Sequence, residues 1–304
     1  MATPLITASM LLAAPASISW TVVPTLTASF QQNAAQLGAV CWRATSYVDT
    51  YCHQPLRAAV HTDTLTGPGA ARVAVDRNTG TGTLLARYGP VTGVAAVQVS
   101  SARAFPPAWA LVPAGQYSVR EPVDFSELAT GPSGSNVVDV APGYIRWAHG
   151  RAGQKILLST VSGWPHTSLT ASAGEGDGTL AVDDVTGWAG CAGYIYDGLV
   201  PETAEVTAVS AASPKQLPGV AGTVQSGPGT LTLASPLSGQ HPIGTVISAV
   251  PGNVIHAGIL AATVEALETI DAIATQSLSG QMAGGTGILA EQCELLLDEF
   301  CRVA

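Results

Sequence analysis

The sequence predicts an α+β fold, in which a small helical bundle with accompanying β-strands carries an inserted all-β domain of the barrel or sandwich type. Three observations predict it. Apolar residues recur every three or four positions in residues 26–52 and 254–304, which is the spacing of amphipathic helices. Short β-rich runs separated by Gly and Pro fill the middle of the chain. The last part of this middle region, residues 167–252, has the same β-rich pattern and predicts a separate unit.

The insertion has a proline at each boundary. A strand-like run ends at Pro165, and the next helical pattern begins only after Pro251. We therefore expect two structural units along the chain: a core formed by residues 1–166 and 253–304, and an inserted β domain at residues 167–252.

Near the start of the chain, Thr7–Ala14 predicts a short helix that ends at Pro15, because proline cannot continue a helix. This region is apolar like the centre of a signal peptide. However, no Lys or Arg precedes Arg43, so the basic start of such a peptide is missing. No apolar run reaches the length of a transmembrane helix, and we expect no membrane partner.

The first long helix is predicted between Leu26 and Cys52. Thr25 is its expected N-cap, and Pro55 stops it. Its apolar stripe consists of Leu26, Phe30, Ala34, Leu37, Cys41, Ala44, Val48 and Tyr51.

The segment between this helix and Pro165 predicts β-structure. Ser126–Val137 is rich in Gly, Ser and Pro, which predicts a loop. The expected strands are Arg72–Asp76, Thr83–Tyr88, Gly93–Ser100, Ala108–Val112, Tyr117–Glu121, Tyr144–Ala148 and Lys155–Val161.

The inserted segment contains an internal repeat. Asp177–Val182 and Pro228–Leu233 both have a turn followed by Gly-Thr-Leu and an alternating strand pattern. Lys215–Gly229 predicts an exposed hairpin tip or loop. Further strands are expected at Tyr194–Tyr196, Ala204–Val209 and Thr245–Val250. About six short strands are typical of a small barrel or sandwich.

Two helices are predicted after Pro251, separated by the glycine-rich segment Ser279–Gly287, which we expect to be a flexible hinge. A helix of about 15 residues is marginal alone in water, so the apolar stripe of the last helix must dock on something. We expect this stripe to be an assembly interface formed by Leu289, Cys293, Leu296, Phe300 and Val303. Another side of the same helix carries Glu291, Glu294 and Asp298. These residues form either a solvated side of the helix or an acidic contact or channel-facing surface in a ring.

The composition favours an assembly. Only 11% of the 304 residues are charged, less than half of typical usage, so much of the surface is expected to face other protein. A proteome rich in Ala, Gly and Thr is the alternative explanation. The net charge is −9, with an excess of three basic residues in 1–163 and of six acidic residues in each of 164–252 and 253–304. This distribution argues against a basic nucleic-acid-binding stripe and permits an acidic wall past which DNA slides.

The sequence contains no catalytic or metal-binding motif. The six histidines are scattered without ligand spacing, and no nucleophile elbow or phosphate-binding glycine loop is present. On regular helices, Cys41 and Cys52 would lie about 16 Å apart, and Cys293 and Cys301 about 12 Å apart, too far for either pair to bridge. We therefore expect free thiols in a cytoplasmic setting, no enzymatic activity, no catalytic residues, no cofactor and no metal.

Three segments resemble the head-to-tail connector, or adaptor, proteins of tailed bacteriophages. The first is the helix end Ala44–Cys52 followed by Pro55-Leu56. The second is the strand with its Gly-aromatic-Pro step, Ile156–Pro165. The third is the closing helix, Ala290–Val303, which ends in Phe-Cys-Arg-Val. The likeness covers about two-thirds of the chain, whereas the segment 167–252 is similar to β inserts of phage structural proteins.

This resemblance implies a virion structural protein at the neck, the head-to-tail junction, made in the bacterial host cytoplasm. It implies a homo-oligomeric ring, a dodecamer, that docks on the portal protein and extends the DNA channel. The other partners would be a head-completion (stopper) or tail-terminator protein, and genomic DNA that passes through without sequence-specific binding. The family has neither a catalytic activity nor a cofactor.

A second hypothesis from another class is a β-rich phage baseplate or host-surface adhesion protein, in which the inserted domain binds a glycan or a receptor. This hypothesis predicts an exposed aromatic cluster. The local candidates for it are Trp164, Trp188, Tyr194 and Tyr196.

Overall fold

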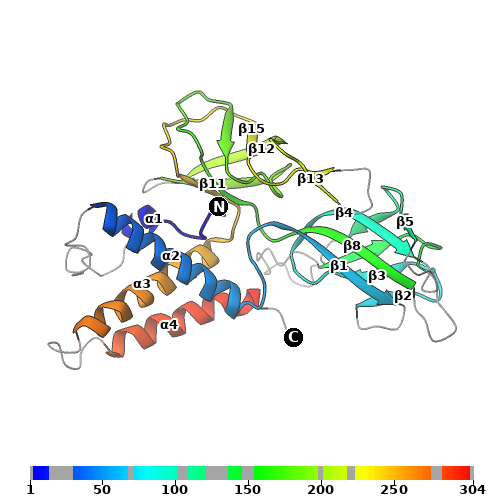
Figure 1. Cartoon of the computed structure of the whole chain (residues 1–304), viewed down its shortest axis with the longest axis horizontal. Helices are drawn as coiled ribbons and strands as arrows, with labels where there is room; N and C mark the ends of the chain where they lie inside the picture. Colours follow the sequence, from blue (N-terminus) through cyan, green and yellow to red (C-terminus); the bar gives the residue numbers. More distant parts are fainter. Residues whose placement is uncertain are drawn as a thin grey trace, which may run out of the picture.

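The computed structural model describes residues 3–13, 30–67, 72–100, 108–120, 136–145, 154–197, 201–217, 223–274 and 283–301. These residues form helices and antiparallel strands, which confirms the α+β class. Three separate hydrophobic clusters divide them into a helical lobe, a β lobe and a β module (Figure 1). The strands that accompany the helices in residues 59–162 have a hydrophobic cluster of their own.

The helical lobe is a layer of three long helices that lie side by side, with a short helix against them (Figure 1). Buried side chains at positions 37, 41, 44 and 48 confirm the apolar stripe of the first long helix, whereas Thr25 and Leu26 lie outside the described residues. The elements are α1 (Ala8–Ala13), α2 (Phe30–Tyr51), α3 (Gly252–Ala274), α4 (Ala283–Leu297) and the 3-10 helix η3 (Asp298–Phe300).

The start of α4 corrects part of the predicted hinge. Residues 283–287 already belong to this helix, although three of them are glycines, and residues 279–282 lie outside the described residues. Glycine costs about 1 kcal/mol in a helix interior relative to alanine. The packing of α4 along α3 offsets this cost, because tertiary contacts commonly override local propensity.

The β lobe consists of two four-stranded antiparallel sheets, ordered β1-β8-β4-β5 and β2-β3-β7-β6, whose side chains share one core. The long strand β8 pairs with β1 on one side and with β4 on the other. The bounds are β1 (Ala59–Gly67), β2 (Val73–Val75), β3 (Gly82–Leu85), β4 (Val91–Ser100), β5 (Trp109–Leu111), β6 (Tyr117–Val119), β7 (Val137–Val140) and β8 (Gln154–Ser162).

Most of the expected strands of this lobe are present, but sequence reasoning missed β1 and β7. It also placed a strand at Tyr144–Ala148. Tyr144 and Ile145 instead close a turn at Gly143, whose φ of 93° favours glycine, and residues 146–148 lie outside the described residues.

The β module is a six-stranded antiparallel sheet ordered β10-β15-β12-β11-β16-β9, with the predicted hairpin formed by β13 and β14 beside it. The two Gly-Thr-Leu strands are neighbours, since Leu180 of β10 pairs with Leu231 of β15. The bounds are β9 (His166–Ser168), β10 (Thr179–Val182), β11 (Ala192–Tyr196), β12 (Glu202–Ala211), β13 (Lys215–Gln216), β14 (Thr223–Val224), β15 (Gly229–Leu233) and β16 (Val246–Ser248).

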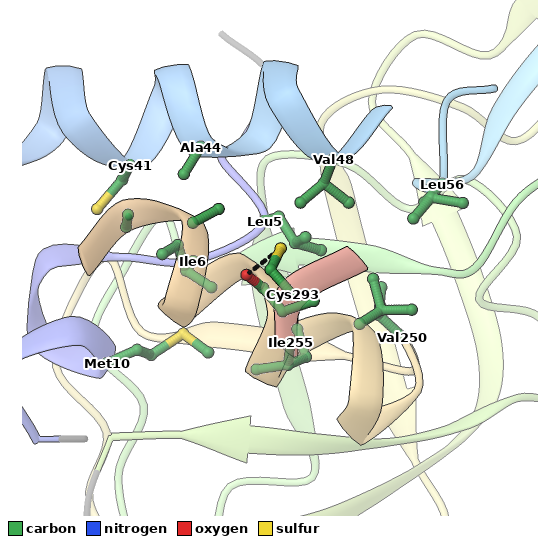
Figure 2. Close-up of a cluster of buried hydrophobic side chains, with 14 of the residues drawn as sticks. Leu5, Ile6, Met10, Cys41, Ala44, Val48, Leu56, Val250, Ile255 and Cys293 are labelled. Carbon is green, nitrogen blue, oxygen red and sulfur yellow. Dashed lines mark hydrogen bonds between the residues drawn. The ribbon is translucent and has the colours of Figure 1, made fainter. Parts of the chain in front are cut away.

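The N-terminal segment joins the helical lobe to the β module. The carbonyl of Thr3 accepts a hydrogen bond from Arg57 Nη1 at 2.6 Å, and the Leu5 N–H donates to Thr45 Oγ1 of α2 at 2.9 Å. The Thr3 hydroxyl donates to Asp183 of the module at 2.9 Å. Leu5 and Ile6 are buried in the helical core, where Figure 2 shows them with Val48 and Ile255.

Candidate assembly surface on the helical lobe

The inner side of α4 belongs to the chain's own core. Cys293 and Leu297 are buried, and the Cys293 thiol donates to the carbonyl of Ala257 on α3 at 3.3 Å, the dashed line in Figure 2. Phe300 is also buried, and its ring meets that of Trp164 edge-on with centroids 5.6 Å apart. This face is therefore filled by intramolecular packing.

The predicted assembly stripe lies largely on this inner side. Cys293 and Phe300 are buried, Leu289 and Leu296 are half-buried, and Val303 lies outside the described residues. The apolar stripe of α4 is therefore covered by other parts of the same chain. In this conformation, a contact with a partner has to use other residues of α4, and the role of the stripe in assembly stays a prediction.

Two of the three predicted acidic residues lie along the seam between α2 and α4. Tyr47 donates its hydroxyl to Glu294 Oε1 at 3.2 Å, and one helical turn later Tyr51 donates to Asp298 Oδ1 at 2.8 Å. The two tyrosine rings are stacked, with centroids 6.2 Å apart. Glu291 is exposed to solvent on the next side of the helix.

The electrostatics of this seam keep both phenols protonated. Burial and the neighbouring Glu294 carboxylate raise the pKa of Tyr47 to about 12. The hydrogen bond to Asp298, together with burial, raises the pKa of Tyr51 as well. Both hydroxyls therefore remain donors at neutral pH, and the acidic side chains act as acceptors between two helices of the same chain.

The outer side of α4 carries apolar side chains that sequence reasoning missed. Ile288 is 59% exposed and Leu295 is 72% exposed. They are seven residues apart, about two helical turns, so they lie on one side, roughly opposite Cys293. The seven-residue spacing of Ile288 and Leu295 could have predicted this outer face. The stripe that contains Cys293 has more apolar residues, and it alone was recognised in the sequence. Glu291 and Glu299 border this outer face, and both are exposed.

Polar contacts hold the neighbouring helices in place. Arg43 of α2 forms an ion pair with Glu265 of α3, and Asn253 at the start of α3 donates to Glu299 Oε1 at 3.1 Å. The exposed ring of Trp42 lies 5.5 Å from the guanidinium of Arg57. The helical lobe thus presents an apolar outer face on a braced scaffold.

His166 and His241 have structural contacts. His166 is buried, donates from Nε2 to the carbonyl of Pro4 at 2.8 Å and accepts at Nδ1 from Ser248 Oγ at 2.9 Å. His241 is buried between the carboxylates of Asp197 and Glu202, the latter at 2.9 Å. In the part of the chain that the structure describes, no cluster of His, Cys, Asp and Glu has the arrangement of a metal site.

The helices of the described ranges include none that is both long and apolar enough to span a membrane. Comparisons with protein-family models, with curated proteins and with solved structures found no match to this chain.

Proposed function

We propose that this chain is a virion structural protein that assembles into a closed head-to-tail connector ring. The observation that carries the proposal is the outer face of α4, where Ile288 and Leu295 remain exposed on a helix whose other side is already packed. In a chain with only 11% charged residues, such a face favours burial against another protein. The resemblance in the three segments described above supports the same class of function.

The proposed ring docks on the portal, extends the DNA channel and joins the capsid to the tail. A ring needs a heterologous contact, in which the outer face of α4 meets a different surface of the next copy and the rotation closes. The acidic residues that border this face, Glu291 and Glu299, disfavour binding to DNA phosphates. This charge is compatible with DNA passing through a channel without being held.

The adhesion hypothesis receives less support. Trp164 and Trp188, two of its four aromatic candidates, are buried in hydrophobic cores. Tyr194 is 49% exposed and packs edge-on against the half-buried Tyr196, with centroids 6.4 Å apart. One such pair is a small surface for binding a glycan or a receptor.

For the β module we propose a closed, barrel-like arrangement of its sheet. The outer strands β9 and β10 approach each other at an antiparallel bridge between Leu169 and Val182. The Thr170 N–H donates to the Ala181 carbonyl at 2.9 Å, and the Asp183 N–H donates to the Ser168 carbonyl at 3.1 Å. Closure would leave the sheet with few unpaired edge strands, so the module would not pair with other chains through a free edge. This property is compatible with a domain that lies on the outside of a ring or contacts neighbouring subunits.

A pair of charge substitutions tests the ring. Leu295→Glu places a carboxylate on the outer face of α4, and we expect it to abolish the rings seen by electron microscopy and native mass spectrometry. Ile243→Glu is the matched control, because Ile243 is 67% exposed on the β module, and this variant should assemble like the parent. A parent protein that stays monomeric at all concentrations and is absent from purified virions would contradict the proposal.

A further inference from the structure

Two cysteines that are far apart in the sequence meet at the end of the seam between α2 and α4. Cys52 directly follows α2, is fully buried and donates its N–H to the Val48 carbonyl at 3.0 Å. Cys301 directly follows η3, and its thiol lies 3.5 Å from the carbonyl oxygen of Tyr51 and 3.4 Å from that of Leu297. Figure 1 shows the ends of α2 and α4 close together.

Cys301 lies next to the backbone that leads into Cys52. The carbonyl of Tyr51 belongs to the peptide unit that leads into Cys52, so the contact of Cys301 with this oxygen brings the two residues together. The two thiols also interact, since each shifts the pKa of the other. Cys301 packs against the same hydrophobic cluster that contains Cys52, and it is partly exposed. The pair therefore combines a buried thiol with one that solvent reaches.

We propose that Cys52 and Cys301 form a latent disulfide, which a small-molecule disulfide such as oxidised glutathione closes, tying the C-terminal segment to the end of helix α2. This inference concerns the isolated chain and does not depend on the ring.

The reaction proceeds in two exchange steps. The Cys301 thiolate attacks one sulfur of oxidised glutathione, which forms a mixed disulfide and releases one glutathione thiolate. Cys52 then loses its proton and attacks the Cys301 sulfur, which forms the protein disulfide and releases the second glutathione. Two protein thiols are oxidised, one small disulfide is reduced to two thiols, and the two protons pass to the departing thiolates.

The surroundings of both groups set the rate of this exchange. Burial raises the pKa of the Cys301 thiol, and burial together with the neighbouring Cys301 raises that of Cys52. Because the thiolate is the attacking species, closure is slow at neutral pH and becomes faster as the pH increases. We therefore expect the pair to stay reduced until an oxidant is supplied.

The cross-link would extend an existing line of contacts. Along the same seam, Tyr47 bonds to Glu294, Tyr51 bonds to Asp298, and Gln54 Nε2 donates to the Phe300 carbonyl at 2.9 Å. A disulfide beyond these bonds closes a loop that contains most of the chain, which restricts the unfolded state strongly. We therefore expect a higher thermal midpoint for the oxidised protein than for the reduced protein.

The nearest competitor is Cys293, the other cysteine of α4. The Cys293 thiol donates a hydrogen bond to the Ala257 carbonyl of α3, and the side chain is buried. Cys41 lies on α2 and is also buried, whereas Cys191 is in the β module. The geometry thus assigns one specific pairing, which peptide mapping can distinguish from the others.

The test uses the full-length protein incubated with oxidised glutathione at alkaline pH, followed by alkylation under denaturing conditions, proteolysis and mass spectrometry. We expect one cross-linked peptide pair, Cys52 with Cys301, and an increase in the thermal midpoint that dithiothreitol reverses. Cys301→Ser should lose both effects. Cys191→Ser is the matched control and should retain both.

Other outcomes overturn the proposal. These are a pairing of Cys52 with Cys293, a product in which Cys301 carries only glutathione, and no oxidation of Cys52 in the folded protein. Cross-linking that is retained in Cys301→Ser would have the same consequence.

Discussion

The helical lobe and the β module, two regions of one chain, bury their residues in different ways. In the helical lobe, apolar groups such as Cys293 and Phe300 fill the space between helices, and neutral phenols bond to carboxylates at the edge. In the β module, a core around Trp188 is accompanied by the imidazole of His241, which is held between two acidic side chains.

The difference also extends to the outer surfaces. α4 exposes Ile288 and Leu295 on one side of one helix, whereas the large apolar residues exposed on the module are Tyr194 of β11 and Ile243 of the turn before β16. An apolar pair on a rigid helix is a better start for an interface than single side chains. We therefore expect the module to be self-sufficient, and we propose that the helical lobe uses its exposed surface to bind a partner. Three substitutions test this division, one in each region and one at the junction.

The largest effect is expected for Phe300→Ala. This change removes a buried ring that packs on Trp164 and should destabilise the protein by about 3–5 kcal/mol. Urea unfolding followed by circular dichroism measures this loss, and hydrogen exchange should show faster opening of α2 and α4 than of the β module. Leu295→Ala is the control, because its side chain is 72% exposed, and its effect should stay within about 0.5 kcal/mol. Equal costs for the two variants would contradict the division of α4 into an inner and an outer side.

The next effect concerns the junction and depends on pH. Burial is the main reason that the pKa of His166 is lowered to about 4, and the charge of Arg57 lowers it further. The hydrogen bond to the Pro4 carbonyl and the nearby Asp183 raise this pKa, but by less. The unfolded chain binds a proton near pH 6.5, where the folded protein does not. The stability from neutral His166 is thus complete above about pH 6.5 and decreases by up to about 3 kcal/mol as the pH falls toward 4.

The measurement compares the free energy of unfolding of the parent and of His166→Gln across this pH range. The parent should lose stability more steeply between about pH 6.5 and 4, and the difference between the two curves should be flat above this window. Parallel curves would mean that His166 does not contribute to the acid sensitivity of the junction.

The sequence was sufficient for the parts of the fold that repeat a simple period. The stripe of α2, the strands around Gly-Thr-Leu and the hairpin at Lys215 could be predicted because their patterns are local. The strand β1 was missed because its nine residues alternate polar Thr and Asp with few apolar side chains, and its pairing with β8 joins residues about 100 positions apart.

The candidate site was harder to predict, because it depends on which side of a helix is covered. The spacing of Leu289, Cys293, Leu296 and Phe300 gives an amphipathic helix, but it does not say whether the cover is the same chain or another one. Likewise, the cysteines were compared only along single helices. Cys52 and Cys301 come close because α2 and α4 run parallel and their C-terminal ends lie together, which no local spacing encodes.

The smallest of the three effects is expected for His241→Asn, and it tests whether the module opens by itself. Both ring nitrogens of His241 face carboxylate oxygens, those of Asp197 and Glu202, so the imidazole links the two acids. Asparagine cannot reach both acids, and the loss should be about 1–3 kcal/mol, since each carboxylate remains partly exposed. Burial alone would raise the pKa of Glu202, but its bonds to the Ser238 N–H and to His241 outweigh burial and lower it. The stabilisation by Glu202 is therefore present above its unfolded pKa and is lost in acid.

Hydrogen exchange locates this loss within the molecule. In His241→Asn, we expect faster exchange in β11, β12 and the segment around Ser238, while α2, α3 and α4 keep the rates of the parent. His256→Asn, at an exposed position on α3, is the matched control and should leave both regions unchanged within about 0.5 kcal/mol. If exchange in the helices accelerates as much as in the module, the two regions unfold together. The module would then depend on the helical lobe, through contacts such as those of Thr3 and His166, rather than being self-sufficient.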